Sequence, residues 1–216
     1  MVDKRNIILA VTGASGAVYA RRILQGLNQP DLRTYLIVSP AGRRLLHEEL
    51  GLETPDAVRL LGEPVRGEIV SLPANDVGAC IASGSFQTHG MVLAPCSSNK
   101  LAQIAHGLGD NLITRAAQVV LKERRPLVLL HREMPLGLIE LRNMVQLTEA
   151  GAVVCPASPG FYMNPRSIDD LVTMVCGRVL DLLRIAHPWK IRWNGAGSPE
   201  NRASAATAPQ AEDPKS

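Results

Sequence analysis

The sequence predicts an α/β fold in which a mostly parallel sheet is flanked by helices. Short runs of β-branched and aliphatic residues alternate along the chain with amphipathic segments at helical spacing, and this alternation is typical of parallel sheets built from βαβ units. Aromatic residues make up only 3% of the chain, so the core is expected to consist of valine, leucine, isoleucine and alanine. Polar or glycine-rich turns follow several of the apolar runs and lead into the next helix.

The strands are predicted from continuous apolar runs, the pattern of strands that are buried on both faces. These runs are residues 7–11, 34–38, 91–94, 127–130 and 152–155. The segment 51–76 is rich in glycine and proline and poorly periodic. Its one short apolar patch, at residues 68–72, is interpreted as a further strand.

The helices are predicted from apolar residues that recur at three- and four-residue spacing. They are residues 17–27, a segment through Arg43 and Glu49, and residues 101–106, 111–122, 135–149 and 168–185. Asp110 is expected to cap the helix at 111–122, and Pro135 to begin the helix that follows it. The whole pattern indicates a Rossmann-like or flavodoxin-like layered fold.

We expect residues 1–194 to form one domain, because a chain of this length buries a single hydrophobic core. Residues 195–216 are polar, rich in alanine, proline and serine, and predict a disordered tail. No apolar stretch approaches the roughly 20 residues of a membrane span, and a net charge of +3 is too small to indicate nucleic acid or a membrane surface. Four cysteines without a Cys-x-x-Cys pair indicate reduced thiols in a cytoplasmic protein and no zinc site.

The turn at residues 12–16 predicts an anion site at the end of the first strand. A strand, a glycine turn and a helix N-terminus present unpaired N–H groups and the positive end of the helix dipole. Ser15 adds a hydroxyl, while Gly13 and Gly16 allow a ligand to approach the backbone. The turn matches neither the dinucleotide fingerprint nor a P-loop, so a tight connection without a ligand stays an alternative.

Polar residues recur where other predicted strands end. Ser39, the segment 95–100 and the pair Arg132–Glu133 each follow an apolar run. Because ligands of open α/β sheets bind beyond the carboxyl ends of the strands, we expect these groups and the turn at 12–16 to share one site.

The charged side chains leave several interpretations open. Arg115 and Lys122 are seven residues apart on one predicted helix and share a face, which fits a solvated edge as well as an anion site. Arg132 follows a buried strand and Arg178 lies among apolar residues, so both need an anionic partner. Glu133 could accept or donate a proton beside Arg132.

Other reactive residue types have ordinary explanations. Glu49 fits a surface residue near a helix end, and Cys96 fits a buried small residue because no base is near it in sequence. The histidines, His131 among them, lack the spacing of metal ligands.

The motifs together resemble one known family. They are Thr-Gly-Ala-Ser-Gly-Ala at 12–17, Ser39, Ser-Gly-Ser-Phe-Gln-Thr-His-Gly-Met at 83–91, Pro-Cys-Ser at 95–97, the stretch from Arg115 to residue 129, Arg-Glu-Met-Pro-Leu at 132–136 and Gly-Phe-Tyr-x-x-Pro at 160–165. In this order and spacing they are similar to the UbiX-type flavin prenyltransferases, from about residue 5 to residue 193.

The resemblance implies an activity and its partners. Such enzymes join a dimethylallyl group from dimethylallyl monophosphate to N5 and C6 of reduced FMN, without a metal. The prenylated FMN serves a partner decarboxylase. Members assemble as dodecamers with sites at subunit junctions, so Tyr162 and Arg178 are expected to reach a neighbouring chain's site.

The resemblance also implies residue roles. FMN would be held by Gly13, Ala14, Ser15, Ser39, Ser97, Ser98, Asn99, Lys100 and Arg132. The dimethylallyl phosphate would be surrounded by Ser83, Arg115, Lys122, Arg132, Glu133, Tyr162 and Arg178, and covered by Trp193. Lys122 and Glu133 would act on the leaving phosphate, while Ser15 and Glu49 would serve the ring-closing proton transfers.

Two positions depart from the family pattern. His131 stands where proline is usual, and Glu140 stands where histidine is expected. Two alternative functions fit the sequence less well. An FMN-dependent cysteine decarboxylase requires a histidine and an asparagine motif that we do not find, and a flavin-carrying subunit of a decarboxylase has no use for Glu133 beside Lys122.

Overall fold

The protein forms a six-stranded sheet in which every strand pair is parallel. The structure is a computed structural model that describes residues 4–53 and 56–189. The strand order is β3-β2-β1-β4-β5-β6. The strands are β1 (Arg5–Val11), β2 (Leu32–Val38), β3 (Glu68–Leu72), β4 (Gly90–Cys96), β5 (Leu127–His131) and β6 (Val153–Pro156). The order reverses between β1 and β4, which places the topological switch point between these two strands.

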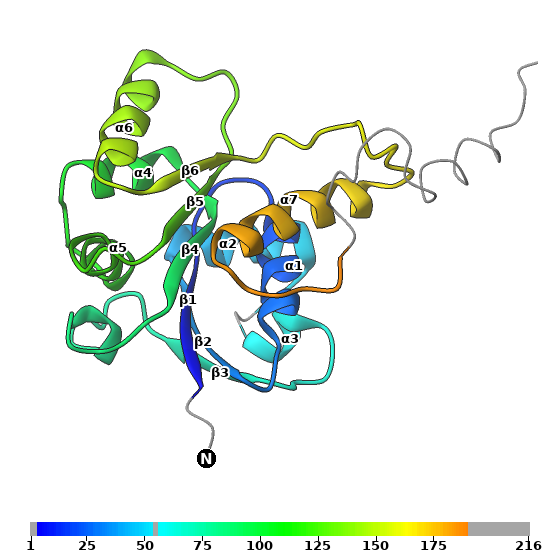
Figure 1. Cartoon of the computed structure of the whole chain (residues 1–216), viewed down its shortest axis with the longest axis horizontal. Helices are drawn as coiled ribbons and strands as arrows, with labels where there is room; N and C mark the ends of the chain where they lie inside the picture. Colours follow the sequence, from blue (N-terminus) through cyan, green and yellow to red (C-terminus); the bar gives the residue numbers. More distant parts are fainter. Residues whose placement is uncertain (1–3, 54–55, 190–216) are drawn as a thin grey trace, which may run out of the picture.

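Helices cover both faces of the sheet, as Figure 1 shows. One face carries α1 (Ala17–Leu27), α2 (Pro40–Leu50), α3 (Ala57–Leu61) and α7 (Ile168–Leu182). The other face carries the short 3-10 turn η1 (Cys80–Ala82), α4 (Ser98–Ala105), α5 (Leu112–Lys122) and α6 (Leu138–Glu149). The predicted layered α/β fold is confirmed.

The core is divided between the two faces by the alternation of side chains along each strand. Ile7 and Leu9 of β1 pack on the α1 side, whereas Ile8 and Ala10 between them pack on the α5 side, and all four are fully buried. Burial on both faces explains why the strands appear in the sequence as unbroken apolar runs.

Three local expectations need correction. The helix α3 lies inside the poorly periodic segment 51–76, and it is capped by Asp56 and ended by Gly62 with a φ of 69°. Asn111, not Asp110, caps α5, since its Oδ1 accepts from the amides of Ile113 and Thr114 at 3.1 and 3.2 Å.

The third correction concerns α6, which begins at Leu138 and not at Pro135. Gly137 has extended backbone angles, and its N–H donates to Glu140 Oε2 at 3.0 Å. Because the Glu140 carboxylate caps Gly137, the helix begins at the next residue, Leu138.

Candidate active site at the carboxyl edge of the sheet

The ends of β1 and β4 are tied together by one buried threonine. Thr12 Oγ1 donates to the Pro95 carbonyl at 2.7 Å and accepts from the Ser97 amide at 2.9 Å. Thr12 is completely buried. The glycine turn after β1 and the serine turn after β4 are consequently held side by side at the switch point, as the sequence predicted for polar strand ends.

The corner between β2 and α2 lies against the same turn. Ser39 caps α2 by accepting from the Gly42 amide at 2.9 Å, and its own amide donates to the Val11 carbonyl at 3.0 Å. A methyl group built on Gly13 would come within 2.5 Å of Ala41 Cβ. Only a residue without a side chain allows this approach of the two corners.

The N-terminus of α1 already holds an anion, and that anion is Glu49. Its carboxylate accepts from the Gly16 amide at 3.0 and 3.2 Å and from the Ala17 amide at 2.7 Å. Glu49 is exposed, as expected of a surface residue, but its carboxylate is bound to the start of α1, which the sequence did not predict. The first amides of the helix thus bind the chain's own carboxylate. The expected phosphate ligand at this turn stays a prediction.

Arg132 and Glu133 leave the end of β5 and face the same turns. Arg132 Nε donates to the Ser15 carbonyl at 3.1 Å. Glu133 Oε2 accepts from Ser98 Oγ at 3.2 Å, and Glu133 Oε1 accepts from the Met134 amide at 3.2 Å. The cation and the carboxylate thus flank the turns that follow β1 and β4.

His131, the last residue of β5, extends this group into the core. It is 3% exposed, and its Nε2 lies 3.1 Å from Ser98 Oγ. Burial lowers the pKa of His131; Glu133 and Glu140 oppose that change, while Arg132 adds to it. The sequence analysis assigned no role to His131. The sequence signal that could have indicated a role for His131 is its position between a buried strand and the pair Arg132–Glu133.

The serine turn after β4 begins α4. Ser97 caps the helix, its Oγ accepting from the Lys100 amide at 3.4 Å. The amides of Ser98 and Asn99 have no hydrogen-bond partner among the described residues, as expected for the first turn of a helix. The Lys100 ammonium donates to Gln103 Oε1 at 2.6 Å, and burial lowers its pKa.

Cys96 is not a reactive thiol in this structure. The side chain is fully buried, and burial raises its pKa to about 12. A thiol with such a pKa stays protonated near neutral pH and is a poor nucleophile. The interpretation of Cys96 as a buried small residue is thereby supported.

Ser83 and Lys122 lie at the opposite edge of the sheet. Ser83 precedes β4, and α5 runs back from the carboxyl edge so that Lys122 ends near the start of β5. A methyl group built on Gly84 would lie 3.0 Å from Lys122 Nζ, which pairs with Glu123 at 3.1 Å. The seven residues of β4 span about 20 Å, so within one chain these residues do not meet Arg132.

Arg115 is the fourth residue of α5 and points outward. It is exposed, whereas Thr114 and Ala116 on either side of it are fully buried. Arg115 and Lys122 share the outer face of α5, as their spacing predicted. In the single chain this face is a solvated edge.

Tyr162 lies in the segment that links β6 to α7, and Arg178 lies in α7. Residues 157–167 reach away from the body of the molecule (Figure 1), and Tyr162 in this arm is 52% exposed. Arg178 pairs with Asp181 at 3.3 Å. Burial raises the pKa of the Cys155 thiol, and the charge of Arg178 opposes only part of that change.

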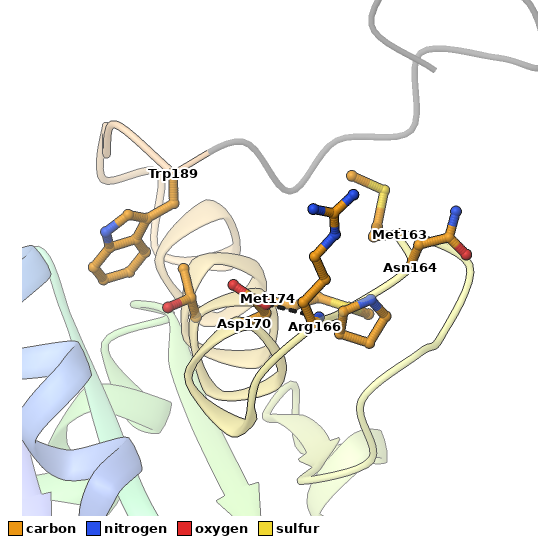
Figure 2. Close-up of a pocket in the computed structure, with 8 residues that line it drawn as sticks. Met163, Asn164, Arg166, Asp170, Met174 and Trp189 are labelled. Atoms are coloured by element: carbon orange, nitrogen blue, oxygen red, sulfur yellow. Dashed lines mark hydrogen bonds between the residues drawn. The ribbon is translucent and has the colours of Figure 1, made fainter. Parts of the chain in front are cut away.

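A cavity of about 370 Å³ opens beside this arm. Figure 2 shows Met163, Met174 and Trp189 around it, with Asp170 holding the Arg166 amide at 2.8 Å. The cavity therefore lies beside the arm that carries Tyr162. Trp193, the residue expected to cover the substrate, and the predicted tail at 195–216 lie outside the described residues.

Within residues 4–53 and 56–189, no three histidine, cysteine, aspartate or glutamate side chains gather as a metal centre would require. No helix in the same ranges is long and apolar enough to cross a membrane.

Comparison with known proteins places this geometry in context. A family model described as Flavoprotein matches residues 1–180. The chain is 47% identical over 195 residues to the flavin prenyltransferase UbiX of Escherichia coli K12, covering 89% of this chain and all of that protein. It is 44% identical over 191 residues to the flavin prenyltransferase UbiX of Neisseria meningitidis serogroup B, covering 88% and 97% of the two chains.

Solved structures give the same picture. AnUbiX in complex with FMN and dimethylallyl pyrophosphate superposes with a TM-score of 0.83 at 39% identity, covering 90% of this chain and all of that one. A dodecameric FMN-dependent Ubix-like decarboxylase of Escherichia coli O157:H7 has a TM-score of 0.81 at 40% identity, with 88% and 100% covered. The cypemycin decarboxylase CypD, at 21% identity and a TM-score of 0.57 over 86% and 97% of the two chains, shares the fold.

Proposed function

This chain belongs to the UbiX-type flavin prenyltransferases, and we propose that it transfers a dimethylallyl group from dimethylallyl monophosphate to N5 and C6 of reduced FMN. The observation that carries the proposal is the relation to flavin prenyltransferases over 89% of the chain. Arg132 and Glu133 at the switch point of the sheet supply a cation and a proton-transferring group where a ligand of this fold binds.

We assign FMN binding to the turns at the carboxyl edge. The residues are Gly13, Ala14, Ser15, Ser39, Ser97, Ser98, Asn99, Lys100 and Arg132. Their donor set fits a flavin phosphate, because it combines hydroxyl groups, the unpartnered amides of Ser98 and Asn99 and the guanidinium of Arg132. Reduced FMN is the acceptor substrate and supplies the nucleophilic N5 and C6 atoms.

We assign the dimethylallyl phosphate to a site shared between chains. Arg132 and Glu133 come from one subunit, and Ser83, Arg115 and Lys122 come from a neighbour, because the fold separates the two groups within one chain. Tyr162 and Arg178, on the projecting arm and on α7, also reach a neighbour's site. Assembly into a dodecamer would bring these groups together.

The chemistry assigns each charged group a task. As the allylic C–O bond breaks and C–N5 forms, the phosphate leaves with the bonding electrons, and Arg115, Lys122 and Arg132 stabilise its growing charge. Glu133 moves the proton between N5 and the departing phosphate. In ring closure, Ser15 and Glu49 serve the transfer of a proton to the allyl unit and the removal of the C6 proton.

The setting of the enzyme follows from its product. Prenylated FMN is delivered to a decarboxylase that uses it as a cofactor. We place the protein in the cytoplasm, where its four unpaired cysteines stay reduced.

The activity is tested by anaerobic incubation of the full chain with reduced FMN and dimethylallyl monophosphate. Mass spectrometry is expected to show FMN heavier by one dimethylallyl unit, and the yield should be unchanged by EDTA. A Glu133→Gln variant should keep FMN and lose about 10²-fold in rate. If FMN is recovered unaltered while a peptide ending in cysteine loses carbon dioxide, the protein is a decarboxylase and the proposal is wrong.

The shared site is tested by mixing variants. Lys122→Ala and Arg132→Ala are each expected to be inactive. Random co-assembly at equal amounts restores both residues at about one quarter of the junctions, so co-expressed variants should recover about one quarter of wild-type turnover. If Lys122 and Arg132 of one chain acted in the same site, no mixture of the two variants would recover turnover.

A further inference from the structure

The hydrogen bonds around Ser98 form a chain with a fixed direction. Ser98 Oγ lies 3.2 Å from Glu133 Oε2 and 3.1 Å from His131 Nε2. A carboxylate only accepts, so the single hydroxyl hydrogen of Ser98 points to Glu133. The oxygen of Ser98 must then accept from the imidazole, which requires the proton of neutral His131 to be on Nε2.

We propose that His131 is a positioning residue, which holds the Ser98 hydroxyl on Glu133 and so fixes the carboxylate that moves the proton in prenyl transfer. This inference rests on the proposed function. His131 itself lies too deep to touch a substrate, at 3% exposure, and acts through Ser98.

The surroundings of His131 make it rigid and keep it neutral. Its carbonyl accepts from the Ala157 amide at 2.8 Å, and it pairs in register with Cys96 of β4 and Pro156 of β6. Burial lowers the pKa of the ring; Glu133 beyond β5 and Glu140 on α6 oppose that change, and Arg132 adds to it. Cys96 stays a neutral thiol because burial raises its pKa to about 12.

Both Glu133 oxygens are engaged as a result. Oε1 accepts from the Met134 amide at 3.2 Å, and Oε2 accepts from Ser98. Without a donor at position 131, the Ser98 hydroxyl is free to turn toward other acceptors, and the exposed Glu133 side chain loses one of its two restraints. A proton-transferring group that must stay aligned is slowed by such freedom.

The first test reads the tautomer and does not depend on activity. Magic-angle-spinning NMR of the full chain, with ¹⁵N only in its five histidines, reports which ring nitrogen carries the proton, and His131→Gln identifies the signal. We expect the Nε2–H form and a shift of that signal in Ser98→Ala. An Nδ1–H form, or a signal that Ser98→Ala leaves in place, overturns the proposal even if the protein proves not to be a prenyltransferase.

The second test separates positioning from packing. His131→Gln keeps an N–H donor near the Nε2 position and should stay within about twofold of wild-type kcat. His131→Leu removes the donor and should lose about tenfold in kcat, the worth of one hydrogen bond, with the KM for dimethylallyl monophosphate unchanged. His89→Gln is the control, since the His89 ring nitrogen lies 3.1 Å from the Leu183 carbonyl at the other end of β4. Equal kcat values for the glutamine and leucine variants overturn the proposal, and if the leucine variant does not fold, the tautomer decides.

Discussion

Replacing Glu49 by alanine tests whether the N-terminus of α1 is built to hold an anion. The change removes the acceptor of the Gly16 and Ala17 amides, which now lie 2.7 to 3.2 Å from the carboxylate oxygens. A charged cap at an exposed helix N-terminus contributes about 1 kcal/mol. For a chain of this size, that loss corresponds to a Tm lower by about 2–4 °C.

Added phosphate should reverse this loss. Glu49→Ala opens two amides at the positive end of the helix, so inorganic phosphate is expected to bind there. At about ten times its Kd, a bound ion adds about 1.4 kcal/mol to the free energy of unfolding. The variant in phosphate should therefore regain the stability of the wild type, whose amides are already occupied.

The assay is urea unfolding at one fixed protein concentration, with and without phosphate, because assembly makes stability depend on concentration. Glu48→Ala is the matched control, since among the described residues Glu48 pairs only with Arg44, across one turn of α2, and an exposed pair of this kind is worth about 0.3–0.5 kcal/mol. If Glu49→Ala is no less stable than Glu48→Ala, or if phosphate stabilises wild type and variant equally, the reasoning about α1 is wrong.

Three further outcomes follow from buried groups. Asn28 is 4% exposed and its amide side chain bonds four groups, among them the Arg66 and Gly67 amides; Asn28→Ala should cost about 2–4 kcal/mol in urea unfolding, and a loss below 1 kcal/mol would contradict this. Gly42→Ala would place a Cβ 2.5 Å from the Val11 carbonyl oxygen, so it should shift the Ser39 corner and weaken FMN binding in a fluorescence titration; unchanged affinity would show that the corner yields freely. Because the pKa of His131 is lowered, the unfolded chain binds a proton below about pH 6.5 that the folded chain does not. The free energy of unfolding should therefore decrease as the pH is lowered from there, by up to about 1.4 kcal/mol per pH unit, until the pH reaches the folded-state pKa. A His131→Gln variant should lack that slope, and identical slopes would remove His131 from the pH dependence.

The secondary structure could be predicted largely from local sequence. The helix α1 begins at Ala17 and ends at Leu27 as expected, and β3 covers residues 68–72 as interpreted. Apolar periodicity encodes these elements directly, because each side chain's face follows from its spacing. Errors occurred where a side chain decides a boundary, as Glu140 does at the start of α6.

The site was predicted only in part. The polar strand ends meet at the carboxyl edge because parallel strands leave no other place for them. The contact of Glu49 was not predicted because its partners, the amides of Gly16 and Ala17, are more than 30 residues away in sequence. The contact exists only because α2 packs beside α1.

The sequence by itself determined the elements, the parallel sheet and, through its motifs, the family and the chemistry. Only the tertiary structure decided which polar groups lie together. Glu49 binds the N-terminus of α1, His131 lies beside Ser98, and Lys122 lies at the edge of the sheet away from Arg132. The physical reason is that backbone periodicity is local, whereas a hydrogen bond between distant residues depends on how whole helices and strands pack.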